Sequence, residues 1–186
     1  MNTDERKLIE ACLNHRPDAQ IALYQRYNKA MFNSALRILG NRQEAEDVMQ
    51  EAFITAFARL GTFDGKAPFG SWLKKIVVNK SIDALRRNRS GIFDDIDLIT
   101  NYPDNDKQDE YDVVYQITPE KINDIMKEMK ESYRLILSLH LIEGYPHDQI
   151  AELLGMSYAN VRTRYSRARK LLADNIRQYV TLALLN

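Results

Sequence analysis

The chain has 186 residues, of which 45% are hydrophobic, with only seven Gly and five Pro. This composition is typical of a folded, helix-rich protein and argues against a fold built from many short strands. The formal net charge is zero, from 26 basic and 26 acidic residues, and this average by itself speaks against a nucleic-acid partner. The single cysteine, Cys12, excludes an intramolecular disulfide and a thiolate zinc site, as expected in a reducing compartment.

The charges are unevenly distributed along the chain. Residues 1–89 carry a net charge of +5, residues 90–131 carry −8, and residues 132–186 carry +3. We interpret this pattern as two basic helical domains, at residues 1–90 and 118–186, joined by an acidic linker at residues 91–117. The N-terminal segment lacks the apolar core of a signal peptide and a membrane-spanning stretch, so we expect a cytoplasmic protein.

Helical periodicity begins at residues 17–39, where apolar side chains recur every three or four positions and Gly40 supplies a stop. A second helix is predicted over residues 42–60. Asn41 stands at the spacing of an N-cap to Glu44, and the apolar repeat that follows is unbroken.

A loop is predicted over residues 61–68, followed by a helix over residues 69–89. Trp72 falls in the apolar stripe of this helix, and we favour a core position for it over a role as a stacking platform. The last sixteen positions contain one acid and six basic residues, a stripe that can follow a phosphate backbone: Lys74, Lys75, Lys80, Arg86, Arg87 and Arg89.

The second domain is predicted to begin with Thr118 as a cap and Pro119 in the first helical turn. A helix of roughly residues 131–143 follows. The segment from His147 to Val161 then has the spacing of a helix-turn-helix, a common DNA-binding unit in which the second helix enters the major groove.

Three residues support the helix-turn-helix interpretation: Gly155 can adopt the left-handed turn, Ser157 can cap the second helix, and Val161 returns to the core. Pro146 stands where Ser or Thr would cap the first helix, so we expect that cap to be absent or supplied elsewhere. We predict that nine residues of the second helix face outward: Tyr158, Asn160, Arg162, Thr163, Arg164, Ser166, Arg167, Arg169 and Lys170.

The chemistry of that predicted face suits DNA. Arg can bond guanine or phosphate, Asn can pair with adenine, and Ser or Thr can do either. Residues 162–177 contain six basic side chains and one acid. The alternative, a solvated amphipathic helix, accounts less well for this charge density. Our candidate DNA contacts here are Ser157, Tyr158, Asn160, Arg162, Thr163, Arg164 and Arg167.

Two long segments carry a family resemblance. The run Glu44-Ala-Glu-Asp-Val-Met-Gln-Glu-Ala-Phe53 resembles the signature of sigma-factor domain 2, and the similarity continues from Phe63 to Arg87. Residues 122–172 resemble sigma domain 4. With only these two domains and a short linker, the chain is similar to the extracytoplasmic-function group of bacterial RNA polymerase sigma factors.

The resemblance implies partners and site residues. It implies that Asp47, Gln50 and Glu51 bind the β′ clamp helices of core RNA polymerase, and that the second domain reaches the β flap. It also implies sequestration by an anti-sigma factor, with no cofactor, metal or small-molecule substrate. In the family, the loop and the helix after it recognise melted promoter DNA, which gives these downstream candidates: Phe63, Asp64, Lys66, Lys75, Asn79, Lys80, Arg86 and Arg87.

Two other functions are compatible with parts of the sequence. A helical metal enzyme would use the acids of residues 44–51, but such sites also need histidine, and His15, His140 and His147 lack the spacing. A one-component helix-turn-helix regulator, with a ligand-binding or dimerisation domain, is the stronger alternative. The basic stripe of the first domain favours the sigma factor, because a ligand-binding domain has no need of it.

The acidic linker supports a further hypothesis. Its charge could fold back on the basic faces of the free protein and suppress DNA binding until polymerase separates the domains. Neutralising its acids would then raise DNA affinity at low salt: Asp94, Asp95, Asp97, Asp104, Asp106 and Asp109.

Overall fold

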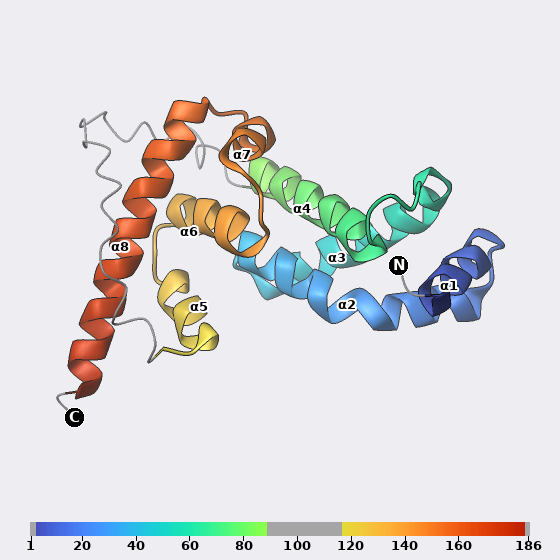
Figure 1. Ribbon diagram of the computed structural model, residues 1–186, viewed down its shortest axis with the longest axis horizontal. Helices are drawn as coiled ribbons and strands as arrows, with labels where there is room; N and C mark the ends of the chain where they lie inside the picture. Colours follow the sequence, from blue (N-terminus) through green and yellow to red (C-terminus); the bar gives the residue numbers. More distant parts are fainter. Residues whose placement is uncertain (1–2, 89–116, 185–186) are drawn as a thin grey trace. The chain divides into compact units, whose positions relative to one another are not determined.

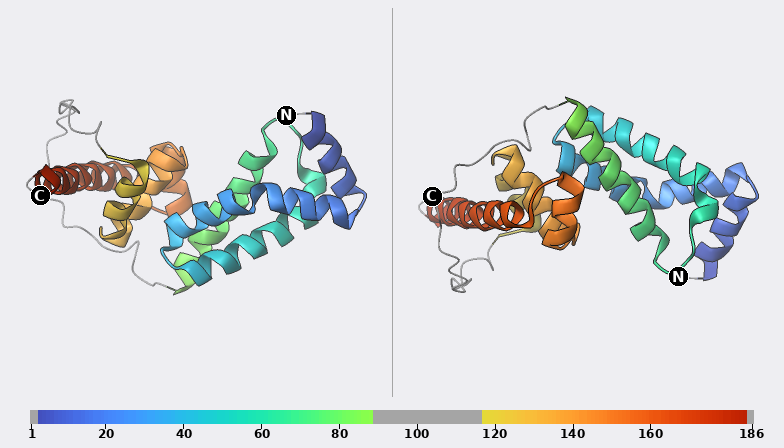
Figure 2. Two further views of the ribbon diagram at one scale, coloured as in Figure 1. Left: turned by 90° about the horizontal axis from the view of Figure 1, so that it is seen from below. Right: turned by 90° about the horizontal axis from the view of Figure 1, so that it is seen from above.

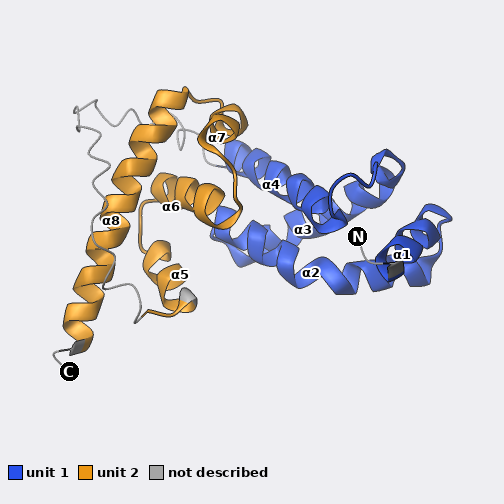
Figure 3. Ribbon diagram, in the orientation of Figure 1, with its two compact units in different colours: residues 1–90 blue, residues 91–186 orange. Residues whose placement is uncertain are grey.

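The computed structural model describes residues 3–88 and 117–184, and its regular structure within those ranges is all helical, which confirms the all-α prediction. The chain divides into two compact units, residues 1–90 and 91–186 (Figures 1 and 3). The predicted acidic linker, and with it the autoinhibition hypothesis, lies outside the described residues except for Ile117, which packs against the core of the second unit.

The first unit is a bundle of long helices: α1 (Thr3–Leu13), α2 (Pro17–Leu39), α3 (Arg42–Ala58), the short 3₁₀ helix η1 (Leu60–Thr62) and α4 (Phe69–Asn88). Helices α2, α3 and α4 each pack against the other two, and α1 lies across one end of α2 (Figures 1 and 2). The largest fully buried side chains of this core are Leu23, Ile38, Leu39, Phe69, Leu73, Ile82 and Leu85.

Local signals place the α2–α3 boundary where the sequence predicts it. Gly40 adopts the left-handed conformation with φ 70°, and its N–H donates to the carbonyl of Leu36. The Asn41 side chain accepts a hydrogen bond of 3.1 Å from the Glu44 N–H, as a helix N-cap should. The other end of α3 differs slightly, since the helix ends at Ala58 and Leu60 already belongs to η1.

Helix α1 was not among the predicted helices. Its buried residues are Glu5, Ile9 and Cys12, which follow one another at intervals of four and three. The same spacing can be seen in the sequence. However, buried Glu residues are rare, so Glu5 was not recognised as part of a buried face.

The second unit is assembled on one long helix: α5 (Pro119–Lys127), α6 (Glu131–Leu137), the π-helical turn η3 (Ser138–Ile142), α7 (His147–Leu154) and α8 (Tyr158–Leu184). Helices α5, α6 and α7 all contact α8. One cluster of buried side chains joins α5, α6 and α8: Met126, Met129, Leu137, Ala168, Leu172 and Ile176.

The continuous helix expected over residues 131–143 is wrong in one respect, because it changes at Ser138 from α-helix to π-helix. The Glu143 N–H donates to the Ser138 carbonyl at 2.9 Å, five residues back. A π-turn inserts one residue into a helix. Residue spacing predicts only that a helix is present, so the insertion could not be read from the sequence.

Candidate nucleic-acid and protein interfaces

The outer face of α3 is acidic and polar, as expected. Asp47, Gln50 and Glu51 are all exposed. An apolar residue that sequence reasoning missed stands beside them: Ile54, one turn after Gln50, is 70% exposed. In the sequence, Ile54 is an apolar residue at a position where the helical pattern predicts a polar one. That mismatch could have identified it. A partner on this surface would therefore meet both charge and an apolar contact.

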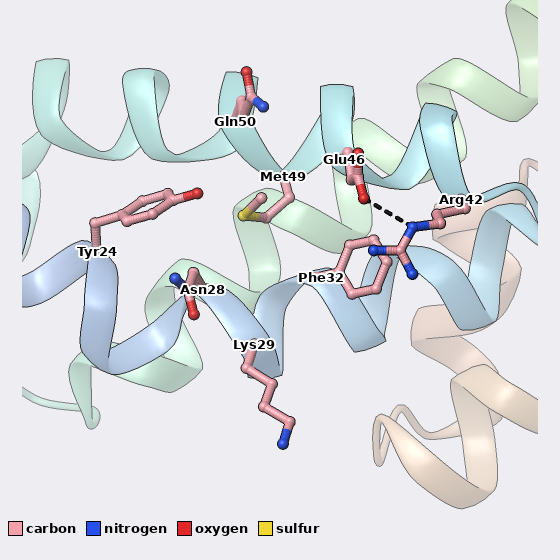
Figure 4. Close-up of a pocket in the computed structure, with 8 residues that line it drawn as sticks. All are labelled: Tyr24, Asn28, Lys29, Phe32, Arg42, Glu46, Met49 and Gln50. Atoms are coloured by element: carbon pink, nitrogen blue, oxygen red, sulfur yellow. Dashed lines mark ion pairs between the residues drawn. The ribbon is translucent and has the colours of Figure 1, made fainter.

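An open groove of about 300 Å³ lies between α2 and α3, next to that face (Figure 4). Tyr24, Phe32 and Met49 form its apolar part, while Gln50 and Lys29 extend away from it on opposite sides. The remaining lining residues are Asn28, Arg42 and Glu46.

Arg42 closes one end of the groove. Its guanidinium lies 5.4 Å from the centre of the Phe32 ring, a cation–π distance, and its Nε is 3.0 Å from the Glu46 carboxylate. Glu46 is accordingly half-buried and paired, rather than part of the exposed acidic face.

The basic edge of α4 adjoins the acidic face of α3. Lys75, Asn79, Arg86 and Arg87 are exposed, as a DNA-binding edge requires. Lys80 differs, because its ammonium is 3.4 Å from the Glu51 carboxylate and its side chain is only 28% exposed. This pair joins two residues that the sequence placed on separate surfaces, so the two surfaces share a border.

In the loop before α4, the first residue packs against α4 and the exposed residues form a tight turn. Phe63 is half-buried, with its ring centre 5.6 Å from that of Phe69 and 5.5 Å from that of Trp72. At the tip, Asp64 accepts a 3.0 Å hydrogen bond from the Lys66 N–H, and Gly65 has φ 71°. Trp72 is therefore neither deeply buried nor an open platform, since it packs against the loop.

Charge at the loop tip is locally compensated. The Lys66 ammonium is 3.2 Å from the second carboxylate oxygen of Asp64. The backbone hydrogen bond from Lys66 and then its side chain hold the pKa of Asp64 below its usual value. The carboxylate is therefore charged under all physiological conditions.

The helix-turn-helix of the second unit is formed as predicted. Gly155 ends α7 with φ 66°, and Ser157 accepts a 3.2 Å hydrogen bond from the Asn160 N–H at the start of α8. Pro146 stands at the N-cap position of α7 and makes no side-chain cap hydrogen bond there.

The reading face of α8 is smaller than the sequence suggested. Tyr158, Asn160, Arg162 and Thr163 are exposed, and Arg167 is half-buried. The expectation that Arg164 faces outward is wrong, because only 6% of it is exposed. With a turn of 3.6 residues, position 164 lies beside the stripe of Val161 and Ala168, on the flank opposite Tyr165. The pattern within α8 leaves both flanks of this stripe open, and the packing of the second unit covers the flank that carries Arg164.

Two histidines pack beside this face, although the sequence indicated no role for them beyond the rejected metal site. The rings of His140 and His147 are centred 4.4 Å apart, and each lies within 5 Å of the Tyr165 ring. Burial, and then the nearby charges of His140 and Arg162, lower the pKa of His147, while Asp148 opposes them. In the sequence, the two histidines stand seven residues apart on either side of a predicted turn. That spacing could have indicated that they lie close together.

The described ranges, 3–88 and 117–184, contain no cluster of three or more His, Cys, Asp or Glu side chains arranged for a metal ion. Within the same ranges, no helix has the length and apolar character needed to cross a membrane.

Comparison with known proteins assigns a family to each of the two units. Residues 23–91 match the Sigma-70 region 2 family, and residues 120–172 match Sigma-70 region 4. The chain is 28% identical to the ECF RNA polymerase sigma factor SigW of Bacillus subtilis, over 92% of this chain and 96% of that protein. The chain belongs to the ECF group of sigma factors. The proposed resemblance is therefore confirmed, and the one-component regulator is not favoured.

Other sigma factors extend the comparison. RNA polymerase sigma-H factor of Pseudomonas aeruginosa is 27% identical, over 90% of this chain and 91% of that protein. Two solved structures share the fold. CnrH, solved with the cytosolic domain of CnrY, has a TM-score of 0.52, 22% identity and coverage of 93% and 97%. RpoE of Bartonella quintana, solved with the anti-sigma factor NepR, has a TM-score of 0.51, 19% identity and coverage of 80% and 91%.

Proposed function

We propose that this sigma factor divides its work between its two units: the first binds core polymerase and the melted promoter strand, and the second reads the upstream duplex. The observation that carries the proposal is the border between the acidic face of α3 and the basic edge of α4, bridged by Lys80 and Glu51. A basic protein and an anionic nucleic acid can therefore bind side by side on one bundle.

On α3, polymerase binding is proposed for Asp47, Gln50 and Glu51, with the β′ clamp helices as the partner. Their exposure, the adjoining groove and the apolar Ile54 support a protein partner. Aromatic and apolar contacts surrounded by charge are typical of protein–protein interfaces. The β flap is the proposed polymerase contact of the second unit.

On α4 and its preceding loop, contacts to melted DNA are proposed for Lys75, Asn79, Arg86 and Arg87, together with the loop tip at residues 64–66. In the second unit, the exposed residues Tyr158, Asn160, Arg162 and Thr163 are proposed to read the major groove, with phosphate held near the Ser157 cap. Arg164 is buried and is therefore not among the proposed contacts.

The role is non-enzymatic and cytoplasmic in this proposal. The solved structures of related fold contain CnrY and NepR, so an anti-sigma partner is also proposed for this chain. Such a partner would compete with polymerase if it covered the α3 face.

Reconstituted transcription tests the proposal. Purified chain and core polymerase should initiate specifically on a subset of genomic promoters. Asp47→Lys should weaken core binding about tenfold or more, because charge reversal in an interface replaces attraction with repulsion. Asp47 is a cleaner test than Glu51, which also pairs with Lys80.

The matched control is Glu10→Lys, a charge reversal at an exposed position of α1. Helix content and thermal midpoint should be unchanged in both variants. Equal core affinity for Asp47→Lys and Glu10→Lys would contradict the assignment of the α3 face.

A further inference from the structure

We infer that α1, which precedes the region 2 match at residues 23–91, positions the promoter-binding loop through a hydrogen bond from Tyr27 to Glu5 and the aromatic contacts beyond it. Glu5, Tyr27 and Phe63 are positioning residues in this view, and none of them needs to touch DNA. The inference rests on the proposed function of the loop at residues 61–68. Helix α1 and this loop lie at the same end of the first unit (Figure 1).

The first step is the docking of α1. Glu5 is 9% exposed and accepts a hydrogen bond from the Tyr27 hydroxyl. A carboxylate is costly to bury unless it is hydrogen-bonded, so this acid favours one position of the Tyr27 hydroxyl. Ile9 and Cys12 continue the same buried face of α1, which packs against both α2 and η1.

The Tyr27 phenol stays a hydrogen-bond donor at physiological pH. Burial, and then the bond to Glu5, raise the pKa of Tyr27 to about 12. The phenol therefore keeps its proton, and remains a donor, throughout the physiological range.

The second step is the contact between Tyr27 and the start of α4. Its ring centre is 5.4 Å from that of Phe69, which is fully buried. A Cβ atom on Gly70 would lie 2.8 Å from Cε1 of Tyr27, closer than real Cβ contacts allow. Gly70 therefore leaves the space that the Tyr27 ring fills, and the ring fits closely against the first turn of α4.

The third step reaches the loop. Phe69 meets Phe63 edge to face at 5.6 Å, and Trp72 contacts both rings. This arrangement is favourable for aromatic pairs. Phe63 thus holds the base of the loop against α4, while the turn at Asp64 and Lys66 shapes its exposed tip.

A route from α1 to the loop follows: Glu5 holds Tyr27, Tyr27 supports Phe69, and Phe69 supports Phe63. Sequence reasoning placed Phe63 among the DNA contacts. Its packing against Phe69 and Trp72 supports an anchoring role instead.

The chain contains its own probe, because Trp72 is the sole tryptophan and lies in this cluster. Glu5→Ala and Tyr27→Phe should each change the emission and acrylamide quenching of Trp72. Their double variant should resemble either single one, because both remove the same interaction. Glu5→Gln keeps a neutral acceptor and should restore most of the wild-type signal.

The matched control is Glu10→Ala, on the same helix but exposed and 3.9 Å from Arg6. It should leave Trp72 unchanged. No Trp72 response to Glu5→Ala and Tyr27→Phe beyond that of Glu10→Ala would overturn the inference.

The functional readout uses holoenzyme made from full-length chain and core polymerase, on a promoter that the wild type opens. Permanganate reactivity should show about five- to tenfold less strand opening for Glu5→Ala and Tyr27→Phe, a typical size for coupling between sites. Core affinity should stay within about twofold of wild type, as expected for changes remote from the α3 face.

Losses of opening and core affinity in equal proportion would indicate general destabilisation and overturn the inference. Failure of wild-type holoenzyme to open any promoter would instead overturn the proposed function, even if Trp72 responds. The two failures are therefore distinguishable.

Discussion

The two units differ in the number of helices that carry their proposed functional surfaces. In the first, α2, α3 and α4, with 23, 17 and 20 residues, each contact the other two, and the proposed polymerase and DNA surfaces lie on different helices. In the second, three shorter helices pack against the 27-residue α8, which also carries the reading face. In the second unit, one helix therefore provides both the main packing surface and the DNA-reading face, whereas the first unit distributes its two proposed surfaces over two helices.

The largest expected effect tests whether the units are independent. Leu137→Ala in the second unit and Leu73→Ala in the first both truncate fully buried side chains. Each should lower the unfolding free energy of its own unit by about 2–5 kcal/mol. Trp72 fluorescence reports the first unit alone, and circular dichroism reports both. A shift of the Trp72 transition in Leu137→Ala as large as in Leu73→Ala would argue for one cooperative body.

Two arginines of α8 sharpen the comparison. Arg162→Ala should weaken specific upstream DNA binding by about 1–3 kcal/mol with little effect on the thermal midpoint, because Arg162 is exposed. Arg164→Ala should lower the unfolding free energy by about 2 kcal/mol, because the removed side chain is buried.

Thermal melting and a DNA titration of the holoenzyme measure both quantities. If Arg164→Ala left stability unchanged and reduced only DNA affinity, the outward placement predicted from the sequence would be right after all.

A smaller effect concerns the border between α3 and α4. Lys75→Ala should reduce the slope of log affinity for DNA against log salt by about one. Lys80→Ala should reduce it less, because Glu51 already compensates part of that charge. Glu51→Gln should raise DNA affinity at low salt. Identical slopes for the two lysine variants would show that the ion pair is absent in solution.

The smallest expected effect is a pH dependence confined to the second unit. Because the pKa of His147 is lowered on folding, the unfolded chain binds more protons below about pH 6.5, so acid favours unfolding. The stability contributed by this group is present above that pH and is lost as the pH falls below it. His140 from η3, Asp148 from α7, and Arg162 with Tyr165 from α8 surround the ring.

His147→Phe keeps an aromatic ring without the titrating group, and should flatten the fall in stability between roughly pH 7.5 and 5.5. His15→Asn is the control, since His15 is exposed and its φ of 56° suits Asn. Equal pH profiles for His147→Phe and wild type would rule out His147 as the cause. Thermal midpoints measured across that range decide between these outcomes.

Much of the fold was predictable from neighbouring residues. Gly40 with Asn41 placed one helix boundary, and Gly155 with Ser157 placed another, because stop and cap signals act over three or four residues. The exposed acids of α3 and bases of α4 were also predictable, since helical periodicity decides which residues face outward once the apolar stripe is known.

The sequence by itself thus determined the all-helical class, the main helix boundaries and the polar character of the outer faces of α3 and α4. Only the tertiary structure decided that Arg164 is buried, that Lys80 pairs with Glu51, that Glu5 reaches Tyr27, and that Phe63 packs on Trp72. The physical reason is separation along the chain. Caps and periodicity depend on residues a few positions apart, whereas these contacts depend on how helices cross, and a pattern within one helix carries no information about its neighbour.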